Sequence, residues 1–195
     1  LVYPKVYDKR RDFQTLGQDE SPEFVFDLQK NLLFKGKSSV ENGDFLFSFI
    51  VPKDINYDFG NAKISLYAKG NVQGQFCDAL GYNFNMVVGG TSLEYVKDFE
   101  GPQIELFMND TNFIFGGITD ANPSLYAILY DESGINTVGN GIGHHMLAII
   151  DEESSNPIVL NDFYESNINS YKSGTINYPL STLSEGKHSL TVKVW

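Results

Sequence analysis

Few side chains in this sequence could perform nucleophilic catalysis. Cys77 is the only cysteine, and it lies in Gln75-Phe76-Cys77-Asp78, where no catalytic motif surrounds it. A nucleophilic thiolate needs a base held beside it. The sequence also contains no Gly-x-Ser-x-Gly elbow, no phosphate-binding glycine loop and no His-Glu-x-x-His motif. We therefore interpret Cys77 as a structural residue and predict a segment with no catalytic residue, no cofactor and no metal site.

Two features imitate metal sites, and both fail a closer test. Residues 54–60 place oxygen-bearing side chains at alternate positions, as a calcium loop does. Phe59 stands where an EF-hand needs glycine, and Ser65 stands where it needs a bidentate glutamate. His144 and His145 are adjacent, so on a strand their side chains point to opposite faces and do not easily chelate one ion. We interpret residues 54–60 as a strand-end loop and leave calcium as a ligand that no motif supports.

Clustered aromatic residues offer a second kind of chemistry, the stacking of sugar rings. Phe163, Tyr164, Tyr171 and Tyr178 lie within a short stretch of sequence. A sugar platform needs two or three exposed coplanar rings, whereas packing in a core is the commoner fate of such residues. The candidate interaction surface taken from the sequence consists of His144, His145, Phe163, Tyr164 and Tyr171.

The charge of the chain is divided very unequally between its halves. Residues 1–98 carry 11 Lys and Arg against 13 Asp and Glu, a net −2, whereas residues 99–195 carry 3 against 12, a net −9. No basic surface for nucleic acid is expected from such a balance. The acidity either serves solubility or forms a face for a basic partner or for Ca²⁺. No apolar stretch approaches the ~20 residues of a membrane helix, so we predict no membrane insertion of this segment.

The elements that must position these residues are predicted to be strands. No run of ten or more residues shows helical spacing of apolar positions, whereas short apolar or alternating runs recur between turn residues. Asn42-Gly43 indicates a type I′ hairpin turn. The predicted strands are residues 1–3, 24–28, 32–34, 45–51, 63–68, 82–88, 104–108, 113–115, 125–129, 146–150, 157–160, 175–178 and 188–195.

The charged stretch 97–102, which ends in Gly101-Pro102, predicts a domain boundary. Each half then has the length of a β-sandwich. The expected fold is all-β, with two tandem immunoglobulin-like sandwiches over residues 1–98 and 99–195. Leu1 is not an initiator methionine, and both ends lie in predicted strands, so we expect a piece of a longer protein.

Several motifs make the sequence resemble a known family. They are 42–45, 51–57, 134–137, 141–144, 161–165, 178–180 and 183–195, with 183–195 reading Leu-Ser-Glu-Gly-Lys-His-Ser-Leu-Thr-Val-Lys-Val-Trp. In this order they resemble the region that follows the peptidase domain in type IX secretion system sortases, which are gingipain-type cysteine peptidases. Family members more often read His-Asp where this chain has His144-His145, so no ligand role is transferred to that position.

The resemblance implies a protein on the outer face of the bacterial outer membrane. Such sortases remove the C-terminal sorting domain of secreted cargo and attach the cargo to lipopolysaccharide, together with outer-membrane partner proteins. Their catalytic Cys and His lie upstream of this region, and no residue here matches them. The prediction is therefore a non-catalytic spacer and docking segment that contacts secretion-system proteins or cargo through its acidic half. A carbohydrate-binding module and an adhesin- or macroglobulin-like structural module remain the alternatives.

Overall fold

The computed structural model describes residues 1–53, 55–92, 98–137 and 144–195. Within them the chain forms fifteen strands and one turn of 3₁₀ helix, η1 (Asn161–Phe163). Every strand pairing between these elements is antiparallel. The all-β prediction is confirmed. No helix in the described part of the chain is long and apolar enough to cross a membrane.

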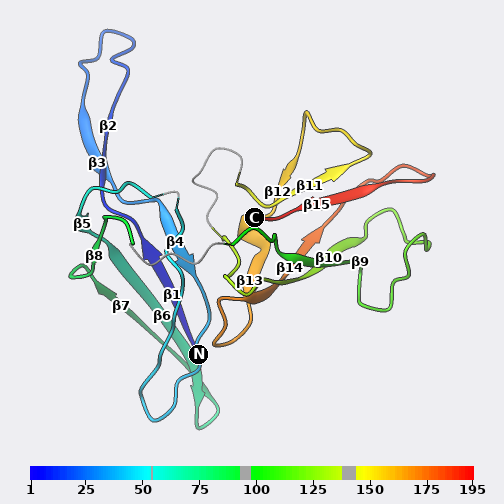
Figure 1. Cartoon of the computed structure of the whole chain (residues 1–195), viewed down its shortest axis with the longest axis horizontal. Helices are drawn as coiled ribbons and strands as arrows, with labels where there is room; N and C mark the ends of the chain where they lie inside the picture. Colours follow the sequence, from blue (N-terminus) through cyan, green and yellow to red (C-terminus); the bar gives the residue numbers. More distant parts are fainter. Residues whose placement is uncertain (54, 93–97, 138–143) are drawn as a thin grey trace.

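The first half is built on one four-stranded sheet in the order β4-β1-β6-β7. Its strands are β1 (Val2–Tyr7), β4 (Leu32–Lys35), β6 (Lys63–Val72) and β7 (Gln75–Asn83). Val2, Pro4 and Val6 alternate with more exposed residues along β1, so these three form its inner face. Figure 1 shows this sheet beside the second half of the chain, with β7 at the outer end of the strand order.

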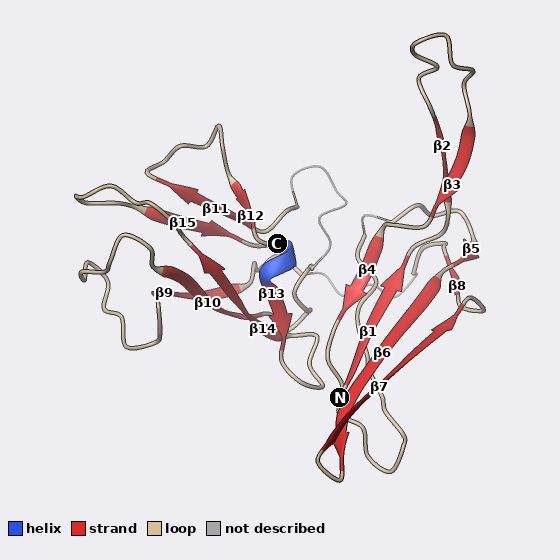
Figure 2. Ribbon diagram, turned by 180° about the vertical axis from the view of Figure 1, so that it is seen from behind, coloured by secondary structure: helices blue, strands red, loops and turns tan. Residues whose placement is uncertain are grey.

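The inner face of this sheet is covered by loop residues and by short strands. Phe47 and Phe49 stack on Phe34, with ring centroids 5.8 and 4.8 Å away. Two two-stranded sheets complete the first half. They pair β2 (Arg11–Gln14) with β3 (Val25–Leu28), a hairpin that projects from the body in Figure 2, and β5 (Gly60–Asn61) with β8 (Val87–Val88).

The second half contains two sheets with a hydrophobic core. One has the order β13-β14-β10-β9 and the other the order β12-β11-β15. Leu125, Leu129, Met146 and Ile176 are fully buried in this core. The strands are β9 (Gln103–Met108), β10 (Ser124–Tyr130), β11 (Leu147–Ile150), β12 (Ile158–Val159), β13 (Tyr164–Ser166), β14 (Ser173–Pro179) and β15 (Leu190–Lys193).

Two predicted strands are wrong. Residues 45–51 form no strand, although Phe47 and Phe49 do point inward, because this segment lies over a sheet instead of pairing with one. The Asn42-Gly43 turn before it is confirmed, since both residues have positive φ (53° and 93°) and Glu41 pairs with Asp44. Residues 113–115 lie in the long β9–β10 loop.

The remaining predicted strands overlap observed strands, and the sequence missed three more. These are β2, β5 and β13. The run predicted at 82–88 divides into the end of β7 and the short β8. The strand predicted at 63–68 continues to Val72, because a turn at Gln73-Gly74 returns the chain as β7. Part of the predicted boundary, including Lys97, lies outside the described residues.

Candidate interaction surfaces

The described residues bring together no group of three or more His, Cys, Asp or Glu side chains that could hold a metal ion. Asp54 and the motif at 141–143 lie outside these residues. Cys77 is exposed on β7, with its Sγ 3.7 Å from the carbonyl oxygen of Gln75. It therefore does not contribute to a core. The features with functional potential are surfaces, which we describe in turn.

The predicted aromatic cluster is separated by the fold. Tyr164 is only 1% exposed, in the core of the second half, where burial raises the pKa of its phenol. It cannot present a ring to a ligand, because β13 pairs with β14 and places Tyr164 opposite the buried Ile176. Phe163 is 38% exposed. Its ring packs edge to face against the ring of Tyr178, with the two ring centroids 4.6 Å apart. These aromatic residues therefore form no common platform for a sugar, and Tyr164 packs in the core, which is the commoner fate of such residues.

The two histidines lie beside the C-terminal residue. The His144 ring is 5.6 Å from the Trp195 ring, and the Trp195 indole donates a hydrogen bond to the backbone carbonyl of His145 at 3.2 Å. Trp195 is itself half-exposed. This contact fastens the end of the chain after β15 to the start of β11.

Tyr171 takes part in a contact between the halves. It packs against the first-half core that contains Phe34 and Val6. Beside it, Asn169 Oδ1 accepts a hydrogen bond from the backbone N–H of Ser39 at 2.9 Å, and the backbone N–H of Asn169 donates to the Lys37 carbonyl at 2.9 Å. We call residues 37–39 and 165–171 the junction.

The junction contains buried and charged groups as well. Ser38 is fully buried, and its hydroxyl donates to the Leu46 carbonyl at 2.6 Å. Lys37 pairs with Glu165, and the bond holds the pKa of Glu165 below its usual range. Asn169 has φ of 59°, a conformation that asparagine tolerates better than most residues. Sequence analysis missed this contact, because its partners are about 130 positions apart.

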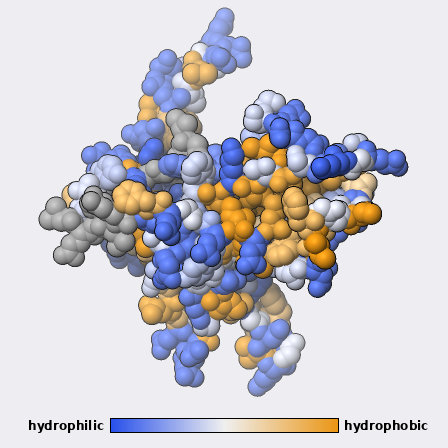
Figure 3. Space-filling model, turned by 45° about the vertical axis from the view of Figure 1, so that its right-hand side comes forward, coloured by the Kyte–Doolittle hydropathy of each residue, from blue (hydrophilic) through white to orange (hydrophobic). Residues whose placement is uncertain are grey.

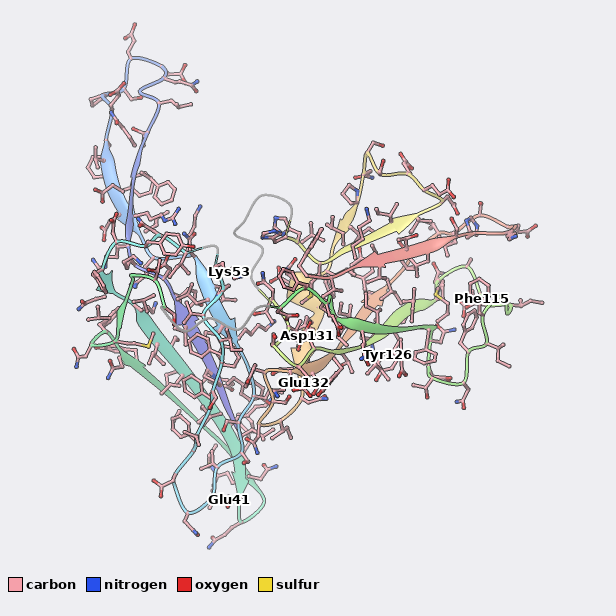
Figure 4. All side chains as sticks on the ribbon, in the orientation of Figure 1. Glu41, Lys53, Phe115, Tyr126, Asp131 and Glu132 are labelled. Carbon is pink, nitrogen blue, oxygen red and sulfur yellow. The ribbon has the colours of Figure 1, made fainter. Side chains whose placement is uncertain are left out.

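The β9–β10 loop ends in an apolar tip. Ile114 is 79% exposed, and Phe115 and Ile118 are almost completely exposed. Gly116 turns the chain between them with φ of 80°. Figure 4 shows Phe115 at the far end of the second half from the junction, and Figure 3 shows apolar residues extending over this side of the molecule. We call residues 114–118 the apolar tip.

Acidic side chains flank the apolar tip on its supporting loop. Asp110 accepts a hydrogen bond from the backbone N–H of Asn112 at 2.8 Å, and Asp120 accepts one from Asn122 at 2.7 Å. Both aspartates are exposed, and they stand on either side of residues 114–118 in the sequence. Exposed apolar side chains rimmed by charge are typical of protein contact sites.

The outer face of the first sheet is a third surface. The strand register places Tyr3, Tyr67 and Leu80 in one row across the sheet. The rings of Tyr3 and Tyr67 are 6.1 Å apart, and Lys69 Nζ lies 4.8 Å from the Tyr3 ring. Leu80 is 83% exposed. This face therefore presents aromatic, aliphatic and basic groups to solvent.

Comparison with known proteins finds similarity to a solved structure. No family model matches the chain, and no curated protein shows significant similarity to it. The crystal structure of dimeric latent PorU from Porphyromonas gingivalis is similar, with a TM-score of 0.50 and 32% sequence identity. The match covers 100% of this chain and 18% of the PorU chain. PorU is a type IX secretion system sortase, so the resemblance predicted from the sequence motifs is confirmed for a segment of PorU.

Proposed function

We propose that this chain is a non-catalytic segment of a cell-surface type IX secretion sortase. The parent is then a gingipain-like cysteine endopeptidase that cleaves the C-terminal sorting domains of secreted cargo at the outer membrane. The observation that carries this proposal is the similarity of the whole chain to 18% of PorU at 32% identity.

A spacer role is supported by the junction. Asn169, Tyr171 and the Lys37–Glu165 pair connect the halves through a hydrogen bond, an apolar contact and an ion pair. Such a contact holds two modules at a fixed spacing, whereas a bare linker does not. We propose that the halves are tandem immunoglobulin-like sandwiches over residues 1–98 and 99–195, with the two facing sheets of the second half as the main support.

A docking role is supported by the apolar tip. Phe115 and Ile118 are exposed without covering any core, and Asp110 and Asp120 flank them. The matching partner surface is an apolar cleft rimmed by Lys or Arg, on an outer-membrane component of the secretion system or on cargo. The acidic rim then guides association and the apolar group supplies affinity.

The test replaces Phe115 and Ile118 together with Asp in the full-length parent. We expect recovery of secretion-system partners in a pull-down to fall at least about tenfold, because tenfold corresponds to only 1.4 kcal/mol. The matched control is Leu16→Asp, which alters another highly exposed apolar residue, in the loop between β2 and β3. Unchanged recovery with the double variant would exclude docking through the tip. A parent reading frame without an upstream Cys/His peptidase domain would exclude the sortase itself.

A carbohydrate-binding or adhesin-like module is the second candidate, and one observation favours it. The outer face of the first sheet carries the Tyr3 and Tyr67 rings with Lys63 and Lys69 beside tyrosines. Aromatic rings stack on sugars, and lysines bind their acidic groups. A polysaccharide gel-shift in which Tyr67→Ala weakens retention, while Tyr57→Ala on an exposed loop does not, would support it. Equal retention of both variants would speak against it.

A further inference from the structure

Three oxygen groups converge near the base of the projecting β2–β3 hairpin. They are the carboxylate of Asp8, directly after β1, and the backbone carbonyls of Asn56 and Val88. Asn56 precedes β5, and Val88 lies in β8, which pairs with β5. Only 2% of the Asp8 side chain is exposed. A carboxylate buried to this extent needs a cation or several hydrogen-bond donors beside it.

The ammonium group of Lys9 lies where these oxygens meet. Its Nζ is 2.9 Å from Oδ1 of Asp8, 2.7 Å from the Asn56 carbonyl and 3.4 Å from the Val88 carbonyl. An ammonium group has three N–H donors, so each donor has one acceptor here. The Lys9 side chain is only 11% exposed, although lysine side chains ordinarily extend into solvent. The guanidinium of Arg11 is 3.9 Å from Oδ2 of Asp8, which is beyond hydrogen-bond length, so it does not replace Lys9.

Other hydrogen bonds hold the surrounding groups in place. The backbone N–H of Asp58 donates to Oδ1 of Asn56 at 2.9 Å and closes a turn at Asn56. The side-chain amide of Gln29 donates to the backbone carbonyls of Asp8 and Asn61, at 2.9 and 3.2 Å. These bonds do not involve Lys9. The oxygens are therefore positioned by the fold and form a site that Lys9 fills.

The route to this site is narrow and passes over Gly60. A Cβ atom at Gly60 would lie 2.6 Å from Cδ of Lys9, so the methylene groups of Lys9 cover this glycine closely. Lys9 also lines a cavity of about 550 Å³ together with Asn56 and Asp58. Removal of the Lys9 side chain would therefore open a path from this cavity to the three oxygens.

The number and the distances of the oxygens select the kind of cation. Calcium requires about six to eight oxygens at roughly 2.3–2.6 Å. Here three oxygens surround the Lys9 nitrogen at 2.7, 2.9 and 3.4 Å. The two shorter distances are those of N–H···O hydrogen bonds from a charged donor. The site therefore suits an ammonium group better than a divalent metal ion.

We propose that Asp8, Asn56 and Val88 form a monovalent-cation site whose permanent occupant is the ammonium of Lys9. The segment that imitates a calcium loop in the sequence then does contribute an oxygen to a cation, through the Asn56 carbonyl. That cation is a side chain of the same chain, so the base of the hairpin keeps its structure without a free metal ion. This inference concerns the first half alone and does not depend on the proposed sortase function.

The first test is chemical rescue of Lys9→Ala in the 195-residue chain. The variant leaves a buried carboxylate without its ammonium partner, so we expect the Tm to fall by at least about 5 °C. Methylammonium chloride should restore at least about half of this loss, because its ammonium binds only the folded chain. Tetramethylammonium chloride at the same concentration has the same charge but no N–H donor, and should restore nothing. Equal restoration by both salts, or by neither, overturns the proposal.

Two further variants separate the site from a general effect of salt. Lys9→Met removes the charge but keeps a long side chain over Gly60, so its Tm should also fall and should not respond to methylammonium. Lys187→Ala, which alters an exposed lysine in a turn of the second half, should leave the Tm unchanged. A response of Lys9→Met to methylammonium as large as that of Lys9→Ala would contradict the site.

The second test uses the unaltered chain and does not depend on the folding of a variant. Because the Lys9 ammonium fills the site, Ca²⁺ should leave the NMR amide signals of Asn56 and Gly60 unchanged. Acetic anhydride should acetylate Lys9 at least about tenfold more slowly than Lys187, since the ammonium must first leave its three acceptors. Calcium-dependent shifts of these two amides, or equal acetylation of the two lysines, would overturn the proposal.

Discussion

The two halves of the chain cover their sheets in different ways. In the second half, ten buried residues form a core that both sheets and their connections supply. In the first half, five buried residues form the core at a single four-stranded sheet, which loop phenylalanines and short strands cover only in part. The strands of both halves show similar apolar alternation in the sequence. Alternation therefore specifies which side chains point inward, and a second layer decides whether a strand is enclosed.

Because of this difference, the residues that stabilise the fold are distinct from the residues that are exposed for contact with a partner. The second half encloses its strands and presents its apolar tip on a loop, so the tip is free to contact a partner without loosening the core. The first half leaves a whole strand, β7, exposed on both faces.

The largest expected effect is a loss of stability when a core residue is truncated, and it should differ between the two halves. Leu129→Ala removes a fully buried side chain from the second half and should lower the free energy of unfolding by about 2–5 kcal/mol. Leu66→Ala is the matched change on β6 of the first half, where the side chain is only half-buried, and should cost clearly less. Urea denaturation of both variants measures the difference. An equal or larger loss for Leu66→Ala would refute the comparison.

A smaller loss of stability is expected when the contact between the two halves at the junction is removed. Asn169→Gly removes the acceptor of the Ser39 N–H while keeping the positive φ, and should cost about 1–3 kcal/mol. Asn169→Ala should lower the free energy of unfolding by about 1–2 kcal/mol more, because the left-handed conformation is unfavourable for alanine. Thermal denaturation gives the stability, and hydrogen exchange at the Ser39 amide gives the local opening. Unchanged exchange at Ser39 would show that the halves are held by other contacts.

The smallest effect concerns the exposed rim of the second half. The pKa of His188 is raised from its ordinary 6.5 by the Ser184 carbonyl and by Asp151, whose carboxylate lies 2.8 Å from Nδ1. This contact stabilises the protein fully below pH 6.5 and is lost as the pH rises through the folded pKa of His188. The pKa of Asp151 is lowered from 3.8 by the hydrogen bond from His188, so its contribution is present above pH 3.8 and is lost as the pH falls through its folded pKa.

An NMR titration of His188 provides the measurement. Asp151→Asn should move the pKa of His188 back toward 6.5, because the neutral amide no longer favours the imidazolium. Glu152→Gln, at the neighbouring acidic position, should leave it in place. A His188 pKa that does not respond to Asp151→Asn would show that the Ser184 carbonyl alone is responsible.

Local patterns predicted much of the fold, and long-range packing explains the failures. Asn42-Gly43 predicted its turn because both residues favour positive φ. Gln73-Gly74 adopts the same kind of turn without that signal, so the length of β6 and the existence of most of β7 were missed. The run at 45–51 alternates as a strand does, but within the described residues no strand pairs with it.

The interaction surfaces were harder to predict than the strands. Nothing near Tyr164 in the sequence distinguishes it from Phe163, yet its pairing opposite Ile176 buries one while the other stays partly exposed. Tyr171 was predicted to lie on an interaction surface, and the fold packs it against the other half of the same chain. Residues 113–115, which reach into the apolar tip, were predicted as a strand, because their alternation carries no sign that a partner strand is missing.

The placement of the first and last strands has a mechanical consequence. β1 lies between β4 and β6, so tension on the N-terminus must shear two rows of hydrogen bonds at once. β15 lies at the end of its sheet with β11 as its strand partner, and beyond it Trp195 is held by its indole and its carbonyl. A pull between the two ends therefore peels the C-terminal strand first. The first strand to detach therefore belongs to the second half, although that half has the larger core.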